Sequence, residues 1–347
     1  MLIVLKRTLA QGVLAALLLL GINELRDVQR IGKTFDFASE PKSYRAAVQR
    51  AGPAVVNVYG NLLASRLSKG LRLGSGVIVT PNGYIITNHH LVEQVSTITV
   101  ALQDGRLFRE VQLVGSDKLT DIAVLKINGS QLPVIPGNLQ RPIQIGDIVL
   151  AIGNPFNLGQ TVTQGIISAT ERIRVTPGSI GRQRFLQTDA AINQGNSGGA
   201  LVNTLGELIG INTLLLNEQG IESSGNIGFA IPAKIALEVM QQIIREGRVV
   251  RGYLGFELME LSVKQRNELG LWPLNGLFVK SVERQDTLGL IQPGDVILQV
   301  NGISIITALE TMTQVANIPP GEQVELQVLR QGHKHQISIS VTELPIH

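Results

Sequence analysis

Hydrophobic and polar positions follow two different patterns along the chain. Residues 9–22, LAQGVLAALLLLGI, form one apolar run broken only by Gln11. From the Gly52-Pro53 break to about residue 231, short apolar stretches such as GSGVIVT, GYIITN and IAVLKI recur instead, separated by Gly, Asn and Asp. Short stretches with turn residues between them predict β-strands, and their density favours a barrel or a sandwich.

One segment after these strands has the period of a helix. Residues 232–248, PAKIALEVMQQIIREGR, are amphipathic, with Pro at the start and Gly247 at the end. A helix that closes a β-rich region marks a domain boundary, so we expect a first domain over residues 44–249. Strands then resume around the helical stretch TALETMTQVA, which predicts a second, small module over residues 250–347.

The N-terminal apolar run indicates a membrane segment. Lys6 and Arg7 precede it, and no A-x-A-like cleavage site follows it. The apolar residues 1–5 lengthen the possible span, and the positive charges place the bulk of the chain outside the cytoplasm. We therefore expect an uncleaved signal anchor with a single transmembrane helix over residues 1–25 and a tether over residues 26–43. A cleaved signal peptide is the alternative.

Composition excludes several classes of function. The formal net charge is +3, with both signs interspersed, so no basic patch indicates nucleic acid. The absence of cysteine excludes disulfides, thiolate catalysis and cysteine-bound metals. Ligands for metal-dependent hydrolysis are also lacking, and we expect neither a metal nor another cofactor.

The stretch DAAINQGNSGGALV surrounds Ser197 with Gly195, Gly198 and Gly199. Glycine allows positive φ and close backbone approach, so a bend of this kind can direct N–H groups toward an oxyanion. A tight turn with a surface serine is the alternative. The serine becomes a nucleophile only if the chain also supplies a base and an orienting acid.

Few residues of the first domain can serve as the base or as the orienting acid. Of the five histidines, only His89 and His90 belong to the first domain, where they follow a strand and begin a helical turn. Among the candidate acids, Asp121 lies at the mouth of a buried strand, whereas Asp117 lies in a turn and is expected to be solvated. The other candidate acids are Asp104, Asp147 and Asp189.

Three of these stretches resemble the HtrA family of trypsin-fold serine proteases: TNHHLV, SDKLTDIAVLKI and QTDAAINQGNSGGALVN. The resemblance places the base at His90, the acid at Asp121 and the nucleophile at Ser197, in a solvent-facing cleft. It implies a mainly β fold, with a chymotrypsin/trypsin-like double β-barrel protease domain followed by one PDZ-like domain. The oxyanion hole would be formed by Gly195, Asn196 and Ser197.

The single C-terminal module and the short segment 61–73 are similar to the membrane-anchored branch of the family. That likeness implies a homotrimeric stress sensor on the periplasmic side of the bacterial inner membrane. It would cleave the periplasmic part of an anti-sigma factor when misfolded outer-membrane proteins present their C-termini. Phe156, Gln194 and the stretch RQDTLGLIQPGD depart from the branch, which affects the details of switching. A general periplasmic quality-control protease and an inert membrane-tethered peptide-binding scaffold are the alternatives.

The same resemblance suggests a specificity pocket. In the trypsin-like arrangement, Ala191 lines the pocket base and Ile192 follows it, so cleavage is expected after Val, Ala or a similar small apolar residue. The nearby Asp189 is interpreted as a buried structural carboxylate rather than a specificity residue.

Two regulatory elements complete the interpretation. The expected carboxylate-binding loop of the PDZ domain is Tyr253, Leu254, Gly255 and Phe256, with Leu309 and Met312 on the helix above the bound peptide. These apolar residues would otherwise be ordinary core. The resemblance also places a sensor loop at residues 170–187, with Arg172 and Gln187 as its signalling positions. An ordinary solvated arginine is the alternative for Arg172.

Overall fold

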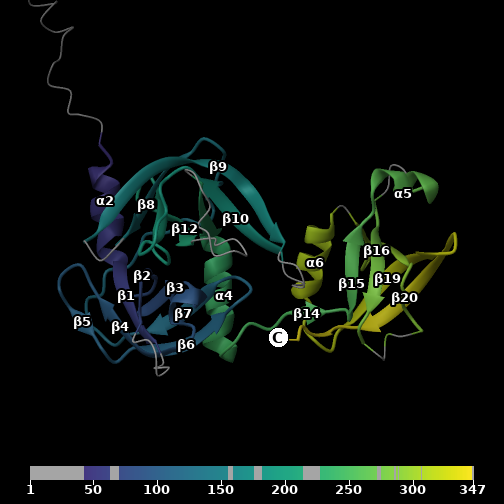
Figure 1. The fold of residues 1–347 in the computed structure, drawn as a ribbon, viewed down its shortest axis with the longest axis horizontal. Helices are drawn as coiled ribbons and strands as arrows, with labels where there is room; N and C mark the ends of the chain where they lie inside the picture. Colours follow the sequence, from purple (N-terminus) through teal and green to yellow (C-terminus); the bar gives the residue numbers. More distant parts are fainter. Residues whose placement is uncertain are drawn as a thin grey trace, which may run out of the picture. The chain divides into compact units, whose positions relative to one another are not determined.

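The computed structural model describes residues 43–62, 70–154, 159–175, 182–213, 227–271, 275–284, 287, 289–305 and 307–345 (Figure 1). The expected signal anchor and the tether up to residue 42 lie outside this part of the chain. Among the residues described, no helix is long and apolar enough to span a bilayer. The regular elements form two β-rich regions, residues 45–246 and 252–343.

Residues 55–126 form a seven-stranded antiparallel sheet in the order β5-β4-β1-β2-β3-β7-β6. Its strands are β1 Val55–Leu62, β2 Leu71–Ile78, β3 Tyr84–Thr87, β4 Val95–Ala101, β5 Leu107–Phe108, β6 Gln112–Asp117 and β7 Ile122–Lys126. Side chains alternate between the two faces of each strand, so every second residue of several strands lies on the same face of the sheet. Together these residues form one apolar core. That core includes Val56, Val58, Ile78, Ile85 and Leu125.

Residues 148–232 form a closed barrel in the order β10-β13-β12-β11-β8-β9. Its strands are β8 Ile148–Gly153, β9 Thr161–Val175, β10 Arg182–Thr188, β11 Ala200–Asn203, β12 Leu208–Thr213 and β13 Gly228–Pro232. The predicted double β-barrel is therefore present as one closed barrel and one sheet. The edges of that sheet, β5 and β6, do not pair, and β5 is only two residues long.

The helices of this region are α2 Arg45–Ala51, the 3-10 turn η1 Gly52–Ala54, α3 His89–Val92 and α4 Ala233–Glu246. The predicted helix over residues 232–248 is α4. It begins after Pro232 and ends at Gly247, whose φ of 75° and N–H bond to the Ile243 carbonyl close the last turn. Its contacts with β6, β7 and β12 join the sheet and the barrel (Figure 1).

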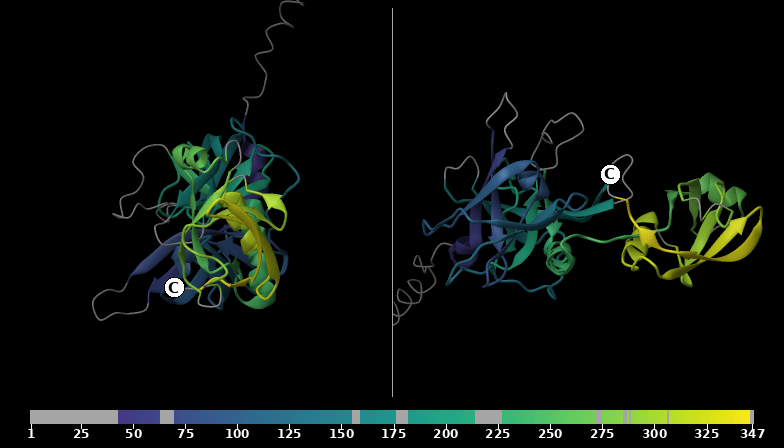
Figure 2. Two further views of the ribbon diagram at one scale, coloured as in Figure 1. Left: turned by 90° about the vertical axis from the view of Figure 1, so that its right-hand side faces the viewer. Right: turned by 90° about the horizontal axis from the view of Figure 1, so that it is seen from below.

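The expected sensor loop at residues 170–187 is mostly strand, so its description as a loop is wrong. β9 and β10 pair as an antiparallel hairpin in which Phe185 lies opposite Arg172, and the two strands run side by side in every view (Figure 1, Figure 2). Residues 176–181, between these strands, lie outside the described part. Pairing satisfies the backbone N–H and C=O groups that an extended loop would leave to water.

The C-terminal region is built on a sheet in the order β15-β16-β17-β19-β20, with β18 paired to β17 and a separate β14-β21 pair. Its elements are β14 Gly252–Tyr253, β15 Phe256–Glu260, α5 Val263–Glu268, β16 Leu277–Val282, β17 Val296–Val300, β18 Ile303–Ser304, α6 Ala308–Ala316, β19 Gln323–Arg330, β20 His333–Ser340 and β21 Thr342–Glu343. Figure 2 shows the strongly twisted β19–β20 hairpin of this sheet. The Thr307 hydroxyl begins α6 by accepting from the Glu310 N–H.

Candidate active site

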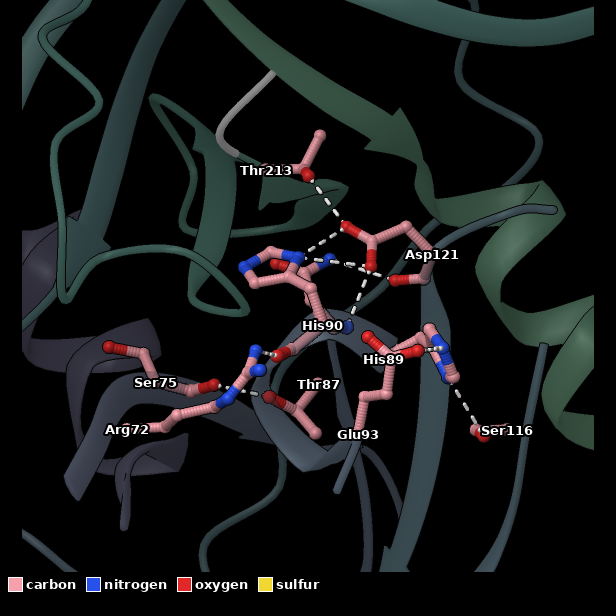
Figure 3. A network of polar contacts seen from close by, with 10 residues as sticks. Arg72, Ser75, Thr87, His89, His90, Glu93, Ser116, Asp121 and Thr213 are labelled. Atoms are coloured by element: carbon pink, nitrogen blue, oxygen red, sulfur yellow. Dashed lines mark hydrogen bonds and ion pairs between the residues drawn. The ribbon is translucent and has the colours of Figure 1, made fainter. Parts of the chain in front are cut away.

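His90 and Asp121 are in direct contact (Figure 3). Nδ1 of His90 lies 2.8 Å from Oδ2 and 3.0 Å from Oδ1 of Asp121. The His90 backbone N–H also donates to Asp121 Oδ1 at 3.0 Å, so one carboxylate fixes both the ring and the backbone of the histidine. A proton on Nδ1, facing the carboxylate, leaves Nε2 as the basic nitrogen.

Asp121 is itself held from several sides. It occupies the left-handed backbone region, with φ of 56°, directly before β7. Its carbonyl accepts from the His89 N–H at 3.1 Å and from the Asn88 side-chain amide at 3.0 Å. Thr213, at the end of β12, donates its hydroxyl to Oδ2 at 2.8 Å (Figure 3). The barrel thus helps to orient a carboxylate that belongs to the sheet.

His89 faces away from this contact. Its Nδ1 lies 3.0 Å from the Ser116 hydroxyl, and its Nε2 lies 3.9 Å from a Glu93 carboxylate oxygen (Figure 3). The side chain of Arg72 reaches the carbonyl of His90. The two adjacent histidines therefore have different surroundings, and only His90 contacts Asp121.

Ser197 lies at the end of the barrel, between β10 and β11, and only 2% of it is exposed. The expectation of a solvent-facing serine is therefore wrong. Its Oγ is buried and has no hydrogen-bond partner among the described residues. Tight packing around the adjacent glycine explains the burial, since a Cβ on Gly198 would meet the Ser75 carbonyl at 2.1 Å.

Two backbone contacts tie the serine to its proposed partners. The Ser75 N–H donates to the Ser197 carbonyl at 2.8 Å, and the Ser75 carbonyl accepts from the hydroxyl of Thr87, three residues before His90. On the other side, the Gly198 N–H donates to the carbonyl of Asn212 at 2.8 Å, next to Thr213. The structure thus connects the serine bend to both the base and the acid, although it gives no hydrogen bond between Ser197 and His90.

The expected oxyanion segment has the backbone that its glycines predict. Gly195 has φ of 97° and Gly198 has φ of 79°. No described residue accepts a hydrogen bond from the N–H of Gly195 or Ser197. Asn196 contributes differently, because its side-chain oxygen accepts from the Asn193 N–H at 3.0 Å and stabilises the bend.

Of the expected pocket residues, Ala191 is exposed and Ile192 packs against the core of the closed barrel. A Cβ on Gly228 would meet Ile192 Cδ1 at 2.9 Å, so this glycine leaves room for the isoleucine. Asp189 is exposed, and the expectation that it is buried is wrong. Its Oδ1 accepts from the Ile166 N–H at 2.7 Å, over the surface of β9.

The carboxylate-binding loop expected in the PDZ region joins β14 to β15. Gly255 has φ of 85°, and its carbonyl accepts from the N–H groups of Glu283 and Arg284. No described residue accepts from the N–H of Leu254 or Gly255. The side chains of Leu254 and Phe256 belong to the core, so the loop can offer its backbone while its side chains support the fold.

Three further residues of this expected site have different positions. Tyr253 is buried and donates to Glu283 at 2.5 Å; burial, and then this carboxylate, raise the pKa of its phenol. Met312 lines a cavity on α6 together with Val315. Leu309 belongs to α6, but its side chain lies outside the described part.

The two expected signalling positions lie on neighbouring strands. Arg172 is on β9, and its side chain is not among those described. Gln187, on β10, is half-buried and pairs with Ala169 and Phe229 through the backbone. They are not opposite one another, because Arg172 pairs with Phe185 and the register of the two strands shifts between Phe185 and Gln187.

Asp117 is not solvated, which corrects the sequence-based expectation. It is 8% exposed, and both of its oxygens accept from the Arg251 guanidinium at 2.7 Å. Burial raises the pKa of this carboxyl, but the hydrogen bonds and charge of Arg251, with further hydrogen bonds from Thr120, hold it below its ordinary value. The sequence does not indicate this ion pair because Arg251 lies 134 residues away from Asp117.

Thr213 and Ser75 are further residues of the site that the sequence does not predict. Neither has a chemical signature in the sequence, since each is a small polar residue within a β-strand pattern. The G-S-G stretch at residues 74–76 offered the one available sign, because glycines on both sides of a buried serine indicate close backbone approach.

Comparisons with known proteins identify both domains. The model of the trypsin-like peptidase domain matches residues 74–211, and the PDZ domain model matches residues 252–341. Serine endoprotease DegS of Salmonella typhimurium is 49% identical over 358 residues, and DegS of Escherichia coli K12 is 48% identical over 355 residues. Each alignment covers 99% of both chains.

Solved structures of serine endoproteases are also similar to this chain. The HtrA-type protease AlgW with a tripeptide has a TM-score of 0.80 at 45% identity, covering 88% of this chain and 99% of AlgW. The serine endoprotease from Yersinia pestis has a TM-score of 0.71 at 50% identity, covering 88% of this chain and 100% of its own. The chain therefore belongs to the HtrA family, as a serine endopeptidase with a trypsin-like peptidase domain and a PDZ domain.

Proposed function

We propose that this endopeptidase is a periplasmic stress sensor that cleaves the periplasmic part of an anti-sigma factor. The C-termini of misfolded outer-membrane proteins would bind its PDZ domain and raise its activity. The observation that carries this proposal is the similarity to DegS over 99% of both chains, combined with the His90–Asp121 contact. Residues 1–25 would anchor the enzyme in the inner membrane as a single span, and its protease domains would form a homotrimer.

In the proposed mechanism, Ser197 Oγ attacks the peptide carbonyl while His90 Nε2 takes its proton and later gives it to the leaving amine. Asp121 keeps the proton of the imidazole on Nδ1, which the 2.8 Å contact supports. The N–H groups of Gly195 and Ser197 hold the oxyanion, and one such donor typically lowers the barrier by about 3–4 kcal/mol. Ser197 Oγ has no hydrogen-bond partner among the described residues, which suits a resting form whose catalytic hydrogen bonds form when substrate binds.

A general periplasmic quality-control protease is the second candidate. Periplasmic pH-dependent serine endoprotease DegQ of Escherichia coli is 41% identical over 273 residues, but the alignment covers only 59% of DegQ. The full-length match to DegS favours the sensor role. The inert scaffold is excluded because the chain is a serine endopeptidase.

The test uses the full-length chain in detergent with purified periplasmic domains of candidate anti-sigma factors, with and without a porin-like C-terminal peptide. We expect peptide-stimulated cleavage by the wild-type chain, and none by Ser197→Ala. A fluorophosphonate probe should label the wild-type chain at Ser197 only. Cleavage of unfolded model proteins at the same rate as the anti-sigma domain would favour quality control instead.

Specificity provides a separate prediction. Because Ile192 packs on the barrel core and no charge is placed at the pocket base, cleavage should follow Val, Ala or a similar residue in a peptide library. Ile192→Ala should admit larger apolar residues, while Asp189→Asn should leave the preference unchanged because Asp189 is exposed. Preferred cleavage after Lys or Arg would contradict the assignment of the pocket.

A further inference from the structure

Ser75 is a completely buried serine in the middle of β2, and all of its polar groups have partners. Its backbone holds the Ser197 carbonyl and the Thr87 hydroxyl, as described above. Its hydroxyl makes two further bonds, to the Asn154 N–H at 3.0 Å and to the Gly195 carbonyl at 2.7 Å. This one residue of the sheet therefore contacts the serine bend at both Gly195 and Ser197.

The direction of the hydroxyl proton follows from these partners. An amide N–H can only donate, so the Ser75 oxygen accepts from Asn154. The hydroxyl proton is then directed to the Gly195 carbonyl, which can only accept. The contact with Asn154, at the end of β8, thus orients the bond to Gly195.

That bond restricts the peptide group between Gly195 and Asn196. The carbonyl side of the group is held by Ser75, and the N–H side donates to the Asn193 carbonyl at 3.2 Å. Gly195 has φ of 97°, in a region where a glycine backbone can turn without steric cost from a side chain. Holding this peptide also fixes the position of the Gly195 Cα. The Gly195 N–H, which belongs to the preceding peptide, can then be redirected only by rotation about φ of Gly195 and the backbone bond before it.

Packing around the hydroxyl leaves little room for an alternative arrangement. A Cβ on Gly153 would lie 2.4 Å from the Cβ of Asn196 and 3.1 Å from Ser75 Oγ. The backbone of β8 therefore lies directly against the serine bend and against this hydroxyl.

We propose that Ser75 is a positioning residue for the oxyanion hole: its hydroxyl fixes the Gly195 carbonyl and so keeps the Gly195 N–H directed at the developing negative charge. The proposal rests on the assignment of Ser197 as nucleophile. Ser75 touches neither substrate nor the reacting atoms. Its effect belongs to the transition state, because the ground-state substrate carries no oxyanion.

Ser75→Ala in the full-length chain tests this. Loss of one direct oxyanion donor lowers kcat by about 10²–10³-fold, so loss of its support should lower kcat by roughly 10- to 100-fold. KM for a peptide substrate with Val before the scissile bond should stay within about twofold, as expected for an interaction made only in the transition state. Affinity for the matching peptide trifluoromethyl ketone, whose adduct places an oxyanion in the hole, should fall by the same factor as kcat.

Two controls separate this role from a general loss of structure. Thr80→Ala removes a hydroxyl that accepts from the Tyr84 N–H in the turn after β2, and it should keep kcat within about twofold. In a chain that carries Ser197→Ala, the peptide is bound but not cleaved. Adding Ser75→Ala to that chain should leave its affinity for the peptide unchanged.

The outcomes distinguish the two proposals. If the wild-type chain cleaves and Ser75→Ala retains its kcat, the positioning role is overturned. A parallel loss of uncleaved-peptide binding would also overturn it, since Ser75 would then be an ordinary structural residue. If the wild-type chain neither cleaves nor reacts with a fluorophosphonate at Ser197, the proposed function fails first.

Discussion

Two aspartates four residues apart, Asp117 and Asp121, show how residues of one type are used for different purposes. Both oxygens of Asp121 contact Nδ1 of His90, and Oδ2 also accepts the Thr213 hydroxyl, in a left-handed conformation that only a few residue types tolerate. Asp117 faces the other way and is paired with Arg251 through both oxygens. The first carboxylate contacts the proposed catalytic base, and the second stabilises the turn that presents it.

The Asp117 pair should contribute strongly to stability. Asp117→Asn leaves the guanidinium of Arg251 without its counter-charge in a largely buried site, so we expect the free energy of unfolding at pH 7 to fall by about 3 kcal/mol. Urea unfolding of the wild type and the variant measures this difference. Asp104→Asn is the matched control, because Asp104 also pairs with an arginine but lies exposed, and it should leave stability unchanged.

The pH dependence follows from the lowered pKa of Asp117. A carboxyl with a folded pKa below its unfolded pKa adds stability that is fully present above the unfolded pKa, at about 3.9. That stability is lost as the pH falls through the folded pKa. The difference between the wild type and Asp117→Asn should therefore shrink below about pH 4. A constant difference from pH 7 into this acid range would contradict the ionic role.

At the scale of elements, the sequence predicts the features that depend on neighbouring residues. Helix α4 was found from its amphipathic period, its Pro and Gly247, all of which act within a few residues. The β9–β10 hairpin is expected as a loop because the resemblance to the family places a sensor loop there, whereas the pairing of its two strands is seen only in the structure. Ser75 and Thr213 could not be assigned, since their partners Gly195 and Asp121 lie 120 and 92 residues away. Contacts at that range depend on how the sheet and the barrel meet.

Two glycines with nearly equal φ provide a prediction for these elements. Gly247 and Gly198 have φ of 75° and 79°, but a Cβ at Gly247 would meet nothing within 4 Å, whereas one at Gly198 would meet Ser75. Gly247→Ala should therefore cost about 1 kcal/mol, from the backbone conformation alone, and keep activity. Gly198→Ala should destabilise the chain further and abolish cleavage. Thermal unfolding with a peptide-cleavage assay compares them, and equal effects would contradict the role of close packing.

At the scale of the whole molecule, the proposed sensor must convert peptide binding into activity. In the proposed sensor, the loop at Gly255 would offer its N–H groups to a terminal carboxylate. β15 is an edge strand of the described sheet, beside which a peptide would add as a strand. A ligand changes the balance of two enzyme states only through its preference for one of them, and a hundredfold shift needs about 2.7 kcal/mol of preference.

Binding and response can be measured separately. A porin-like peptide with a free C-terminus should bind in calorimetry, and amidation should weaken it markedly because the carboxylate is lost. Arg172→Ala should bind this peptide as the wild type does but respond to it poorly in cleavage rate, and Arg245→Ala on α4 serves as the control. Equal affinity for the amidated peptide would remove the carboxylate site, and a normal response of Arg172→Ala would remove its signalling role.

The division of the site between the sheet and the barrel has a consequence for the folding of the newly synthesised chain. His90, on α3, and Asp121, directly before β7, lie on connections of the N-terminal sheet. Ser197, between β10 and β11, and Thr213, at the end of β12, come from the barrel that follows it. On the proposed assignment, a newly made copy that has folded only its first half has a base without a nucleophile, and cannot cleave a peptide bond. Cleavage therefore begins only after the sheet and the barrel have both folded and met.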